Sequence, residues 1–177
     1  MNRDQWNRRY NEKERLWKPT PHPVLRETAE RLPAGSALDL AAGEGRNALY
    51  LAQAGWDVTA VDFADVAVER GKALATQLEL PVHWQVADLT EYEPDRGRFD
   101  LVCVCFLHMP WPQMQQVLIT ASTGVRPGGT FLVLGHDLEN LNEGVGGPQD
   151  PAVLYTPGDV APLLDGFRVQ RAEKARN

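Results

Sequence analysis

The chain has 177 residues, enough for one domain with a full hydrophobic core and too few for two such domains. Hydrophobic residues make up 43% and charged residues 24%, an ordinary balance for a globular protein, and the net charge is −6. No run of about eighteen apolar residues occurs, so a membrane-spanning helix is excluded, and the negative charge argues against a broad nucleic-acid-binding surface.

The N-terminal residues and the cysteines indicate the compartment. Residues 1–15 are polar and contain no apolar stretch of the kind found in a secretory signal. Cys103 and Cys105 are separated by one residue within an apolar run, so a strand would place both on one face, inside the core. We therefore expect no disulfide and a cytoplasmic protein.

Apolar periodicity, glycines and prolines divide the chain into a regular series of elements. Helices are expected at 4–15, 24–32, 65–79, 111–124 and 158–164, a glycine turn and helix at 43–55, and strands at 36–41, 57–62, 82–86, 99–106, 130–134 and from Phe167 onwards. Residues 138–156 are expected to form a long loop. We interpret residues 1–177 as a single domain in which residues 1–23 form an N-terminal helical cap.

The alternation of strands with helices predicts an α/β fold, a three-layer sandwich with a mostly parallel sheet between two layers of helices. In such sheets the ligand lies at the carboxyl ends of the strands, near the point where the strand order reverses. Each motif described next falls at such an end.

The first motif is the turn between the strand at 36–41 and the following helix. Gly43 and Gly45 allow a ligand to approach the backbone closely, and this segment also fits the fingerprint of dinucleotide-binding proteins. Asp39 distinguishes the two kinds of cofactor. A carboxylate there would repel the phosphates of a dinucleotide but attract the cationic amino and sulfonium groups of S-adenosylmethionine (SAM). An alternative role for Asp39 is to cap the amides of the loop itself.

Two further acids follow the next two strands along the chain. Asp62 ends the strand at 57–62, where a carboxylate can accept both ribose hydroxyls of a nucleoside, and Phe63 can pack on the adenine face. Asp88 can accept the adenine amino group while the Leu89 amide meets a ring nitrogen. The alternatives are helix capping for Asp62 and an ordinary loop role for Asp88.

These motifs, in this order, resemble those of the class I SAM-dependent methyltransferases, which have a Rossmann-like fold. The resemblance rests on residues 38–47, 61–63, 87–89, 99–102 and the Arg-Pro-Gly-Gly run at 126–129. Within the class, the Trp-Asn-Arg-Arg-Tyr run at 6–10 is similar to the Trp-Asp-x-x-Tyr opening of the small tellurite-resistance and thiopurine-type enzymes. The resemblance covers nearly the whole chain.

The resemblance implies a site for SAM and for its product S-adenosylhomocysteine (SAH). Asp39 and the backbone of 41–43 would hold the methionine part, Asp62 the ribose, and Asp88 with Leu89 the adenine. Cys105 and Phe106 would line the methyl-transfer site. The full set of cofactor-binding residues implied is Asp39, Ala41, Gly43, Gly45, Asn47, Asp62, Phe63, Asp88, Leu89, Cys105 and Phe106.

The sequence departs from the class in two places. Ala41 and Ala42 stand where a Cys or Gly is usual, which we expect to be harmless. Class I domains end with an antiparallel hairpin of two strands, whereas about one strand follows Gly166 here, so we expect the final antiparallel strand to be missing.

Methyl transfer from a sulfonium is a direct displacement, so the protein mainly aligns the acceptor and excludes water. A general base is needed only for a protonated acceptor, and the candidates are His108 and His136, each past the end of a strand. Either histidine could instead be a plain wall residue. No metal is expected.

A lid over the acceptor side is expected from Trp6, Tyr10, Trp17 and the loop around Gly147. The alternative for the aromatic residues is ordinary packing of an N-terminal helix.

A small molecule is the expected acceptor, with neither nucleic acid nor membrane as a partner, because the segment 106–112 lacks the Asn/Asp-Pro-Pro-aromatic signature of nucleic-acid amino methylation. The resemblance permits tellurite, selenite, thiols and small aromatic hydroxyls as acceptors. Two other functions stay open: an NAD(P)-dependent oxidoreductase, which shares the glycine pattern and Asp62, and a non-catalytic module that binds SAM or SAH.

Overall fold

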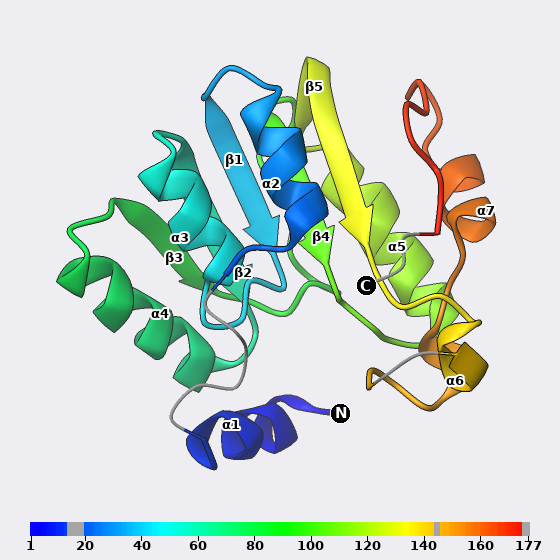
Figure 1. The fold of residues 1–177 in the computed structure, drawn as a ribbon, viewed down its shortest axis with the longest axis horizontal. Coiled ribbons are helices and arrows are strands. Elements are labelled where there is room, and N and C mark those ends of the chain that lie inside the picture. Colours follow the sequence, from blue (N-terminus) through cyan, green and yellow to red (C-terminus); the bar gives the residue numbers. More distant parts are fainter. Residues whose placement is uncertain (14–19, 144–145, 175–177) are drawn as a thin grey trace.

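The computed structural model describes residues 1–13, 20–143 and 146–174 (Figure 1). Its centre is a five-stranded sheet in the order β3-β2-β1-β4-β5, with all neighbouring strands parallel. The strands are β1 (Ser36–Leu40), β2 (Asp57–Asp62), β3 (Val82–Val86), β4 (Phe99–Cys105) and β5 (Val125–Leu134). The strand order reverses between β1 and β4, where such folds bind their ligands.

Helices cover both faces of the sheet, as the predicted three-layer α/β sandwich requires (Figure 1). The helices are α1 (Arg3–Asn11), α2 (Pro23–Glu30), α3 (Arg46–Gln53), α4 (Asp65–Gln77), α5 (Trp111–Ser122), α6 (Asn140–Glu143) and α7 (Pro157–Val160), with single 3-10 turns η1 (Pro151–Val153) and η2 (Ala161–Leu163). In the part of the chain described, none is long and apolar enough to cross a bilayer.

The strand β4 shows why the sheet is buried on both sides. Its alternate residues enter two separate core clusters: Leu101, Cys103 and Cys105 pack with α2 and α3, while Val102 and Val104 pack with α5. This alternation follows from the two-residue period of a strand and explains the nearly continuous apolar run in the sequence. Both cysteines are free and buried, as expected.

The end of the chain differs from the sequence-based expectation. The strand expected from Phe167 onwards does not form within the described residues, and the loop at 138–156 contains α6 and η1. The Phe167 ring instead packs on Phe131 of β5, with 6.1 Å between ring centres. Charged side chains hold the rest of the tail, where Arg171 pairs with Glu27 of α2 at 3.3 Å.

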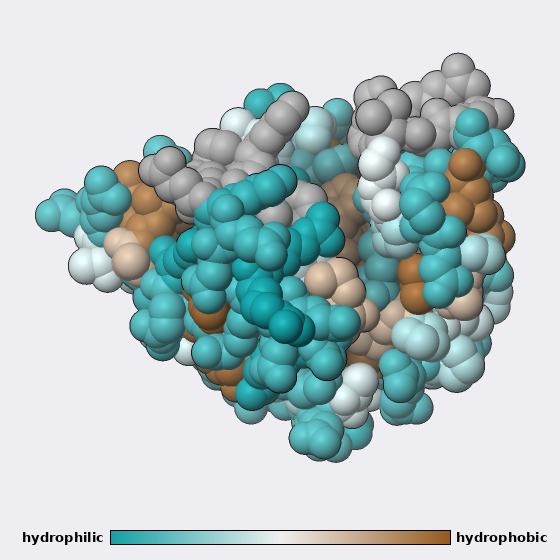
Figure 2. Space-filling model, turned by 90° about the horizontal axis from the view of Figure 1, so that it is seen from below, coloured by the Kyte–Doolittle hydropathy of each residue, from teal (hydrophilic) through white to brown (hydrophobic). Residues whose placement is uncertain are grey.

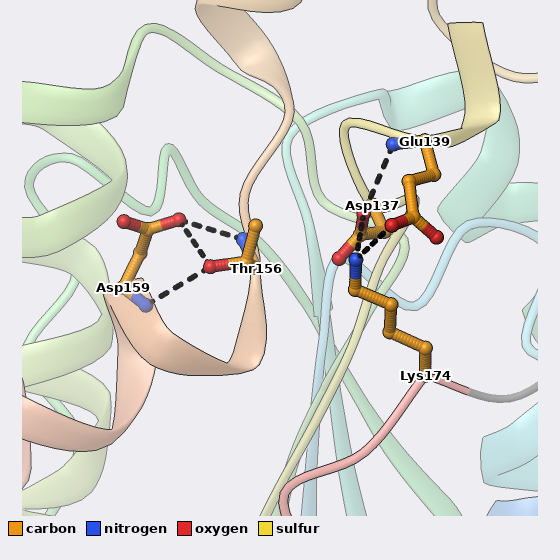
Figure 3. A network of polar contacts seen from close by, with 5 residues as sticks. All are labelled: Asp137, Glu139, Thr156, Asp159 and Lys174. Carbon is orange, nitrogen blue, oxygen red and sulfur yellow. Dashed lines mark hydrogen bonds and ion pairs between the residues drawn. The ribbon is translucent and has the colours of Figure 1, made fainter. Parts of the chain in front are cut away.

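Lys174 fastens the tail to the segment that follows β5. Its Nζ lies 3.3 Å from a carboxylate oxygen of Asp137 and 2.6 Å from a carboxylate oxygen of Glu139 (Figure 3). Nearby, Thr156 and Asp159 form a capping box at the start of α7. The expected strand from Phe167 onwards is therefore wrong for the described residues, where ion pairs and not a neighbouring strand hold this segment.

The N-terminal helix α1 docks at the carboxyl end of β2. Tyr10 is buried with Ala64 and Ala67, and Trp6 packs against the same cluster. Asn7 caps α4 from outside: its Oδ1 accepts the Val66 amide at 3.3 Å, and its Nδ2 donates to Asp65 at 2.6 Å. Because Ala64 supplies no side-chain cap of its own, α1 completes the first turn of α4.

Trp84 of β3 fixes the distance between the glycine loop and α4. A Cβ built on Gly45 would lie 2.3 Å from the indole, and one built on Gly71 of α4 would lie 2.2 Å from it. Both positions therefore need glycine for lack of space, although Gly71 lies within a helix, where glycine is normally unfavourable.

We predict that Gly71→Ala destabilises the protein by roughly 1–3 kcal/mol through overpacking, the opposite of the gain of about 1 kcal/mol expected at an unhindered helical glycine. Urea unfolding of the variant and the native chain measures the difference. Gln77→Ala, at an exposed position of the same helix, is the control and should stay within about 0.5 kcal/mol of the native chain. A Gly71→Ala variant more stable than the native chain would show that the Trp84 ring does not restrict this position.

Candidate functional site

The carboxyl ends of all five strands meet at one edge of the sheet, which is the lower edge in Figure 1. Seen from this side, the surface is hollowed beside α1, and apolar side chains lie in the hollow (Figure 2). The loops that follow the five strands reach this edge, and the residues expected to bind the cofactor lie at the ends of the strands, in these loops or, for Asn47, in the first turn of α3.

The loop after β1 is built from left-handed residues. Ala41, Gly43 and Gly45 have φ values of 58°, 57° and 83°. The two glycines adopt this conformation freely, whereas an L-residue such as Ala41 is disfavoured there by about 1–2 kcal/mol. Ala41 therefore adopts the left-handed conformation at a cost in stability.

Asp62 holds this loop in place. Its carboxylate is buried and accepts the Gly43 amide at 2.8 Å with one oxygen and the Ala64 amide at 2.8 Å with the other. Burial raises the pKa of Asp62, and the two amides oppose that shift. Each oxygen keeps a second acceptor position, so these contacts leave capacity for ligand hydroxyls.

Asp39 has a different environment. It is fully buried, one oxygen lies 3.4 Å from the Cys103 thiol, and Oδ2 has no hydrogen-bond partner. No amide of the 41–45 loop donates to it within the described hydrogen bonds, so the loop-capping role considered for Asp39 is filled by Asp62. Burial raises the pKa of Asp39 to about 7.

The other residues proposed for the nucleoside lie along the same edge. Asp88 is exposed, and its Oδ1 accepts from the Thr90 amide at 2.9 Å, while Leu89 is buried in the core. Phe63 is partly buried against the cluster that includes Trp6. Asn47 is buried, and its Oδ1 accepts the His22 amide at 3.4 Å, which ties the start of α2 to α3.

A row of six aromatic rings crosses the ends of β4 and β5. Successive ring centres lie 5.3 to 5.8 Å apart in the order His22, Phe106, His136, His108, Tyr155 and Trp111. Phe106 takes a left-handed φ of 60°, rare for a bulky residue, and its amide donates to the Leu134 carbonyl at 2.7 Å. Cys105 lies beside it at the end of β4, buried.

The two candidate bases have different surroundings. His108 uses both ring nitrogens, because Nδ1 lies 2.9 Å from the Val153 carbonyl and Nε2 accepts the His136 amide at 3.2 Å. This pattern requires a neutral ring protonated on Nδ1, and burial lowers the pKa of His108. Burial also lowers the pKa of His136, whose ring lies against the backbone of Gly147.

The described residues of the expected lid, Trp6, Tyr10 and Gly147, are not gathered at one place. Trp6 and Tyr10 lie at the end of β2 beside α4, with ring centres 5.8 Å apart, whereas Gly147 lies against His136. Trp17 is outside the described residues. In the described part of the chain, no group of three or more His, Cys, Asp or Glu side chains is placed to hold a metal ion.

Sequence reasoning missed His22, Tyr155 and Arg46 as members of this edge. Arg46 belongs to the glycine motif, and its guanidinium carbon lies 5.2 Å from the centre of the Phe106 ring. Its position directly after Gly45 was the available signal. His22 and Tyr155 gave none, because their contacts join segments far apart in the chain.

We predict that Asp39→Asn removes a pH dependence of stability. With the folded-state pKa of Asp39 raised from 3.8 to about 7, the native fold binds this proton more tightly than the unfolded chain does. Native stability therefore falls as the pH rises between these values, and the variant escapes that loss.

From about pH 4 to pH 8, the unfolding free energy of Asp39→Asn should gain roughly 2–4 kcal/mol relative to the native chain. Urea unfolding at both pH values measures this change. A constant difference between the two proteins would show that Asp39 titrates normally.

Comparison with known proteins relates the chain to methyltransferases. The model of a family described as "Methyltransferase domain" matches residues 37–129. The 2-heptyl-1-hydroxyquinolin-4(1H)-one methyltransferase of Mycobacteroides abscessus is 30% identical over 175 residues, which cover 87% of this chain and 76% of that protein. Hemagglutinin 1 of Eikenella corrodens is 29% identical over 116 residues, 65% of this chain and 39% of its own length.

Among solved structures, the PH0226 protein of Pyrococcus horikoshii superposes with a TM-score of 0.69 at 20% identity and covers 99% of this chain and 89% of that protein. This likeness concerns the fold. The sheet order, the glycine loop with its two acids and the matched family model lead to one conclusion: the chain belongs to the methyltransferase domain family, with a Rossmann-like fold.

Proposed function

We propose that this protein transfers the methyl group of SAM to a small-molecule acceptor by direct in-line displacement. The observation that carries the proposal is the buried Asp39 carboxylate, whose Oδ2 has no partner, beside a backbone loop of left-handed residues. A buried anion without a partner is costly and is matched by a cationic ligand. SAM brings ammonium and sulfonium cations, whereas a dinucleotide would bring phosphates, which disfavours the oxidoreductase alternative.

The residues at this edge fit the parts of the cofactor. Asp39 and the backbone of 41–43 would hold the methionine part, Asp62 the ribose, and Asp88 with Leu89 and Phe63 the adenine. The free acceptor positions on the Asp62 oxygens support its role, since ribose offers two hydroxyl donors. SAM, when bound, supplies an electrophilic methyl group on its sulfonium.

The ring row forms the acceptor side in this proposal. His108 positions His136 by accepting its backbone N–H, and Gly147 packs against the His136 ring. His136 would take the proton of an acceptor hydroxyl at Nδ1 or Nε2, because its pKa is lowered and the ring is neutral at neutral pH. The apolar rings exclude water from the transfer site.

We propose a planar aromatic hydroxyl as the acceptor. The row of rings spaced 5.3 to 5.8 Å apart provides a surface on which such a molecule stacks. The relative from Mycobacteroides abscessus supports the choice, since its name gives a hydroxyquinolone as substrate. The net charge of −6 supports a small molecule over nucleic acid.

Calorimetric titration tests the cofactor. We expect SAH to bind with micromolar affinity and NAD not to bind. Asp62→Ala should weaken SAH binding about 10- to 100-fold, the loss of charged hydrogen bonds worth roughly 1.5–3 kcal/mol. Binding of NAD in place of SAH would overturn the proposal and make the loop a dinucleotide site.

Turnover tests the acceptor and the base. With a 1-hydroxyquinolone as probe, His136→Gln should lower kcat/KM about 100-fold below the pKa of the acceptor hydroxyl, with the deficit shrinking as the pH rises above it. The control is His83→Gln, because His83 is an exposed histidine of β3 that pairs with Asp57. An equal deficit at every pH would remove His136 as the base, and no turnover with any acceptor would favour the non-catalytic binding module.

A further inference from the structure

The strand β3 has a neighbouring strand on one side only. It is the outermost strand in the order β3-β2-β1-β4-β5, and within the described residues it pairs with β2 alone. We call the side of β3 that faces away from β2 its outer side, which lies at the left of the sheet in Figure 1. The outer side of such a strand presents a row of backbone donors and acceptors to any chain that approaches it.

Alternate residues of β3 direct their backbone groups to the outer side. The Ala87 amide, directly after the strand, donates to the Asp62 carbonyl of β2 at 3.0 Å. Because successive residues of a strand direct their N–H and C=O groups to opposite sides, Val82, Trp84 and Val86 face outward. No hydrogen bond among the described residues uses the backbone groups of these residues on that side.

The side chains of Val82, Trp84 and Val86 share the face of the sheet that α4 covers. Val82 and Trp84 pack there against the core, whereas Val86 is 42% exposed. A groove of about 330 Å³ lies between β3 and α4, and its lining residues are Lys72, Ala75, Thr76, Leu80, Val82 and Trp84. The outer side of β3 therefore combines an exposed apolar side chain with a groove whose walls are partly apolar.

The other outermost strand, β5, is flanked by the chain's own tail, whereas β3 is not. Beside β5, the Phe167 ring packs on Phe131, and an ion pair joins Lys174 to Asp137. Proteins protect an outermost strand with such cover, with Lys or Pro inside the strand, or with a bulge. Within the described residues β3 has none of these, because its sequence is Val-His-Trp-Gln-Val, its register with β2 is unbroken, and Pro81 stands before it.

A second copy of the chain matches this side of β3 by symmetry. With a twofold axis at Trp84, antiparallel pairing sets Trp84 opposite Trp84 of the second copy, and Val82 opposite its Val86. These are the residues that face outward, so each N–H on this side meets a C=O of the other copy. The facing side chains are apolar, and His83 meets Gln85 of the second copy, so no like charges are brought together.

We propose that two copies of this chain pair antiparallel along β3 and join their sheets into one. The exposed Val86 of each copy would enter the groove beside Val82 of the other. The symmetric placement of Val82 and Val86 about Trp84 favours a second copy over an unrelated extended segment, which needs no symmetry. Because a strand of 5 residues is short beside the roughly 20–30 residues a side of a standard interface, we expect a dimer that dissociates on dilution.

Sedimentation velocity over a range of protein concentrations tests the pairing. The weight-average mass of the native chain should rise from that of one chain toward twice that value between about 1 and about 500 µM, as for a small and transient interface. Val86→Pro removes an outward N–H and leaves the ladder to β2 intact, while Val86→Lys places a charge opposite an apolar side chain. Each should weaken the association at least about 10-fold.

Ile119→Lys is the matched control. Ile119 is 41% exposed, about as much as Val86, and it belongs to α5, which packs on β4 and β5. This variant loses an apolar surface residue of similar exposure far from β3, so it should associate like the native chain.

Crosslinking tests the register. Chains with Val82→Cys and with Val86→Cys are prepared separately and treated with a short bifunctional maleimide, each alone and as a mixture. Antiparallel pairing about Trp84 sets position 82 opposite position 86, so the mixture should give several-fold more crosslinked dimer than either chain alone. Because Cys103 and Cys105 are buried, the native chain supplies the background.

A native chain that stays monomeric up to about 500 µM would overturn the proposal and leave the outer side of β3 to a partner of another kind. Association that Ile119→Lys weakens and Val86→Lys does not would place the interface on α5 instead. Equal crosslinking in the mixture and in the separate chains would exclude the antiparallel register. If circular dichroism shows that Val86→Pro does not fold, Val86→Lys and the crosslinking decide.

Discussion

The site depends on one carboxylate whose two oxygens each accept an amide of the protein's own backbone. Asp62 accepts the Gly43 amide with one oxygen and the Ala64 amide with the other, so it joins the loop after β1 to the start of α4. Ala64 is also the residue on which Tyr10 of α1 packs. The glycine loop, α4 and the N-terminal helix are therefore positioned together by contacts in which Asp39 takes no part.

The two halves of the carboxyl edge are built differently. Around β1 to β3, the glycine loop and α4 are held by hydrogen bonds, by the Trp84 ring packed against Gly45 and Gly71, and by α1. This half is therefore suited to a ligand that does not vary. Around β4 and β5, the wall consists of rings supplied by separate segments, among them His22 before α2 and Tyr155 before α7. Side chains on such segments can change without disturbing the loop, which suits the half that distinguishes acceptors.

The sequence was sufficient for features set by local rules. The strands at 57–62 and 82–86 form as predicted. Asp39 and Asp62 near the carboxyl ends of β1 and β2, and Asp88 just after β3, lie at one edge because parallel strands point the same way. The sequence was insufficient where the structure depends on contacts between segments far apart in the chain. His108 meets Val153 across 45 residues, and Phe167 finds Phe131 but no strand to pair with. Arg46 was overlooked although it follows Gly45 directly, because its contact with the Phe106 ring joins segments far apart in the chain.

The charge distribution links binding to stability. Burial raises the pKa of Asp39 and of Asp62, so both carboxylates are less favourable in the folded chain than in water. On the proposed function, a ligand that brings an ammonium to Asp39 and hydroxyls to Asp62 would offset both costs. Because such a ligand binds the folded state only, the same contacts that give affinity would also stabilise the loop and the helices attached to it.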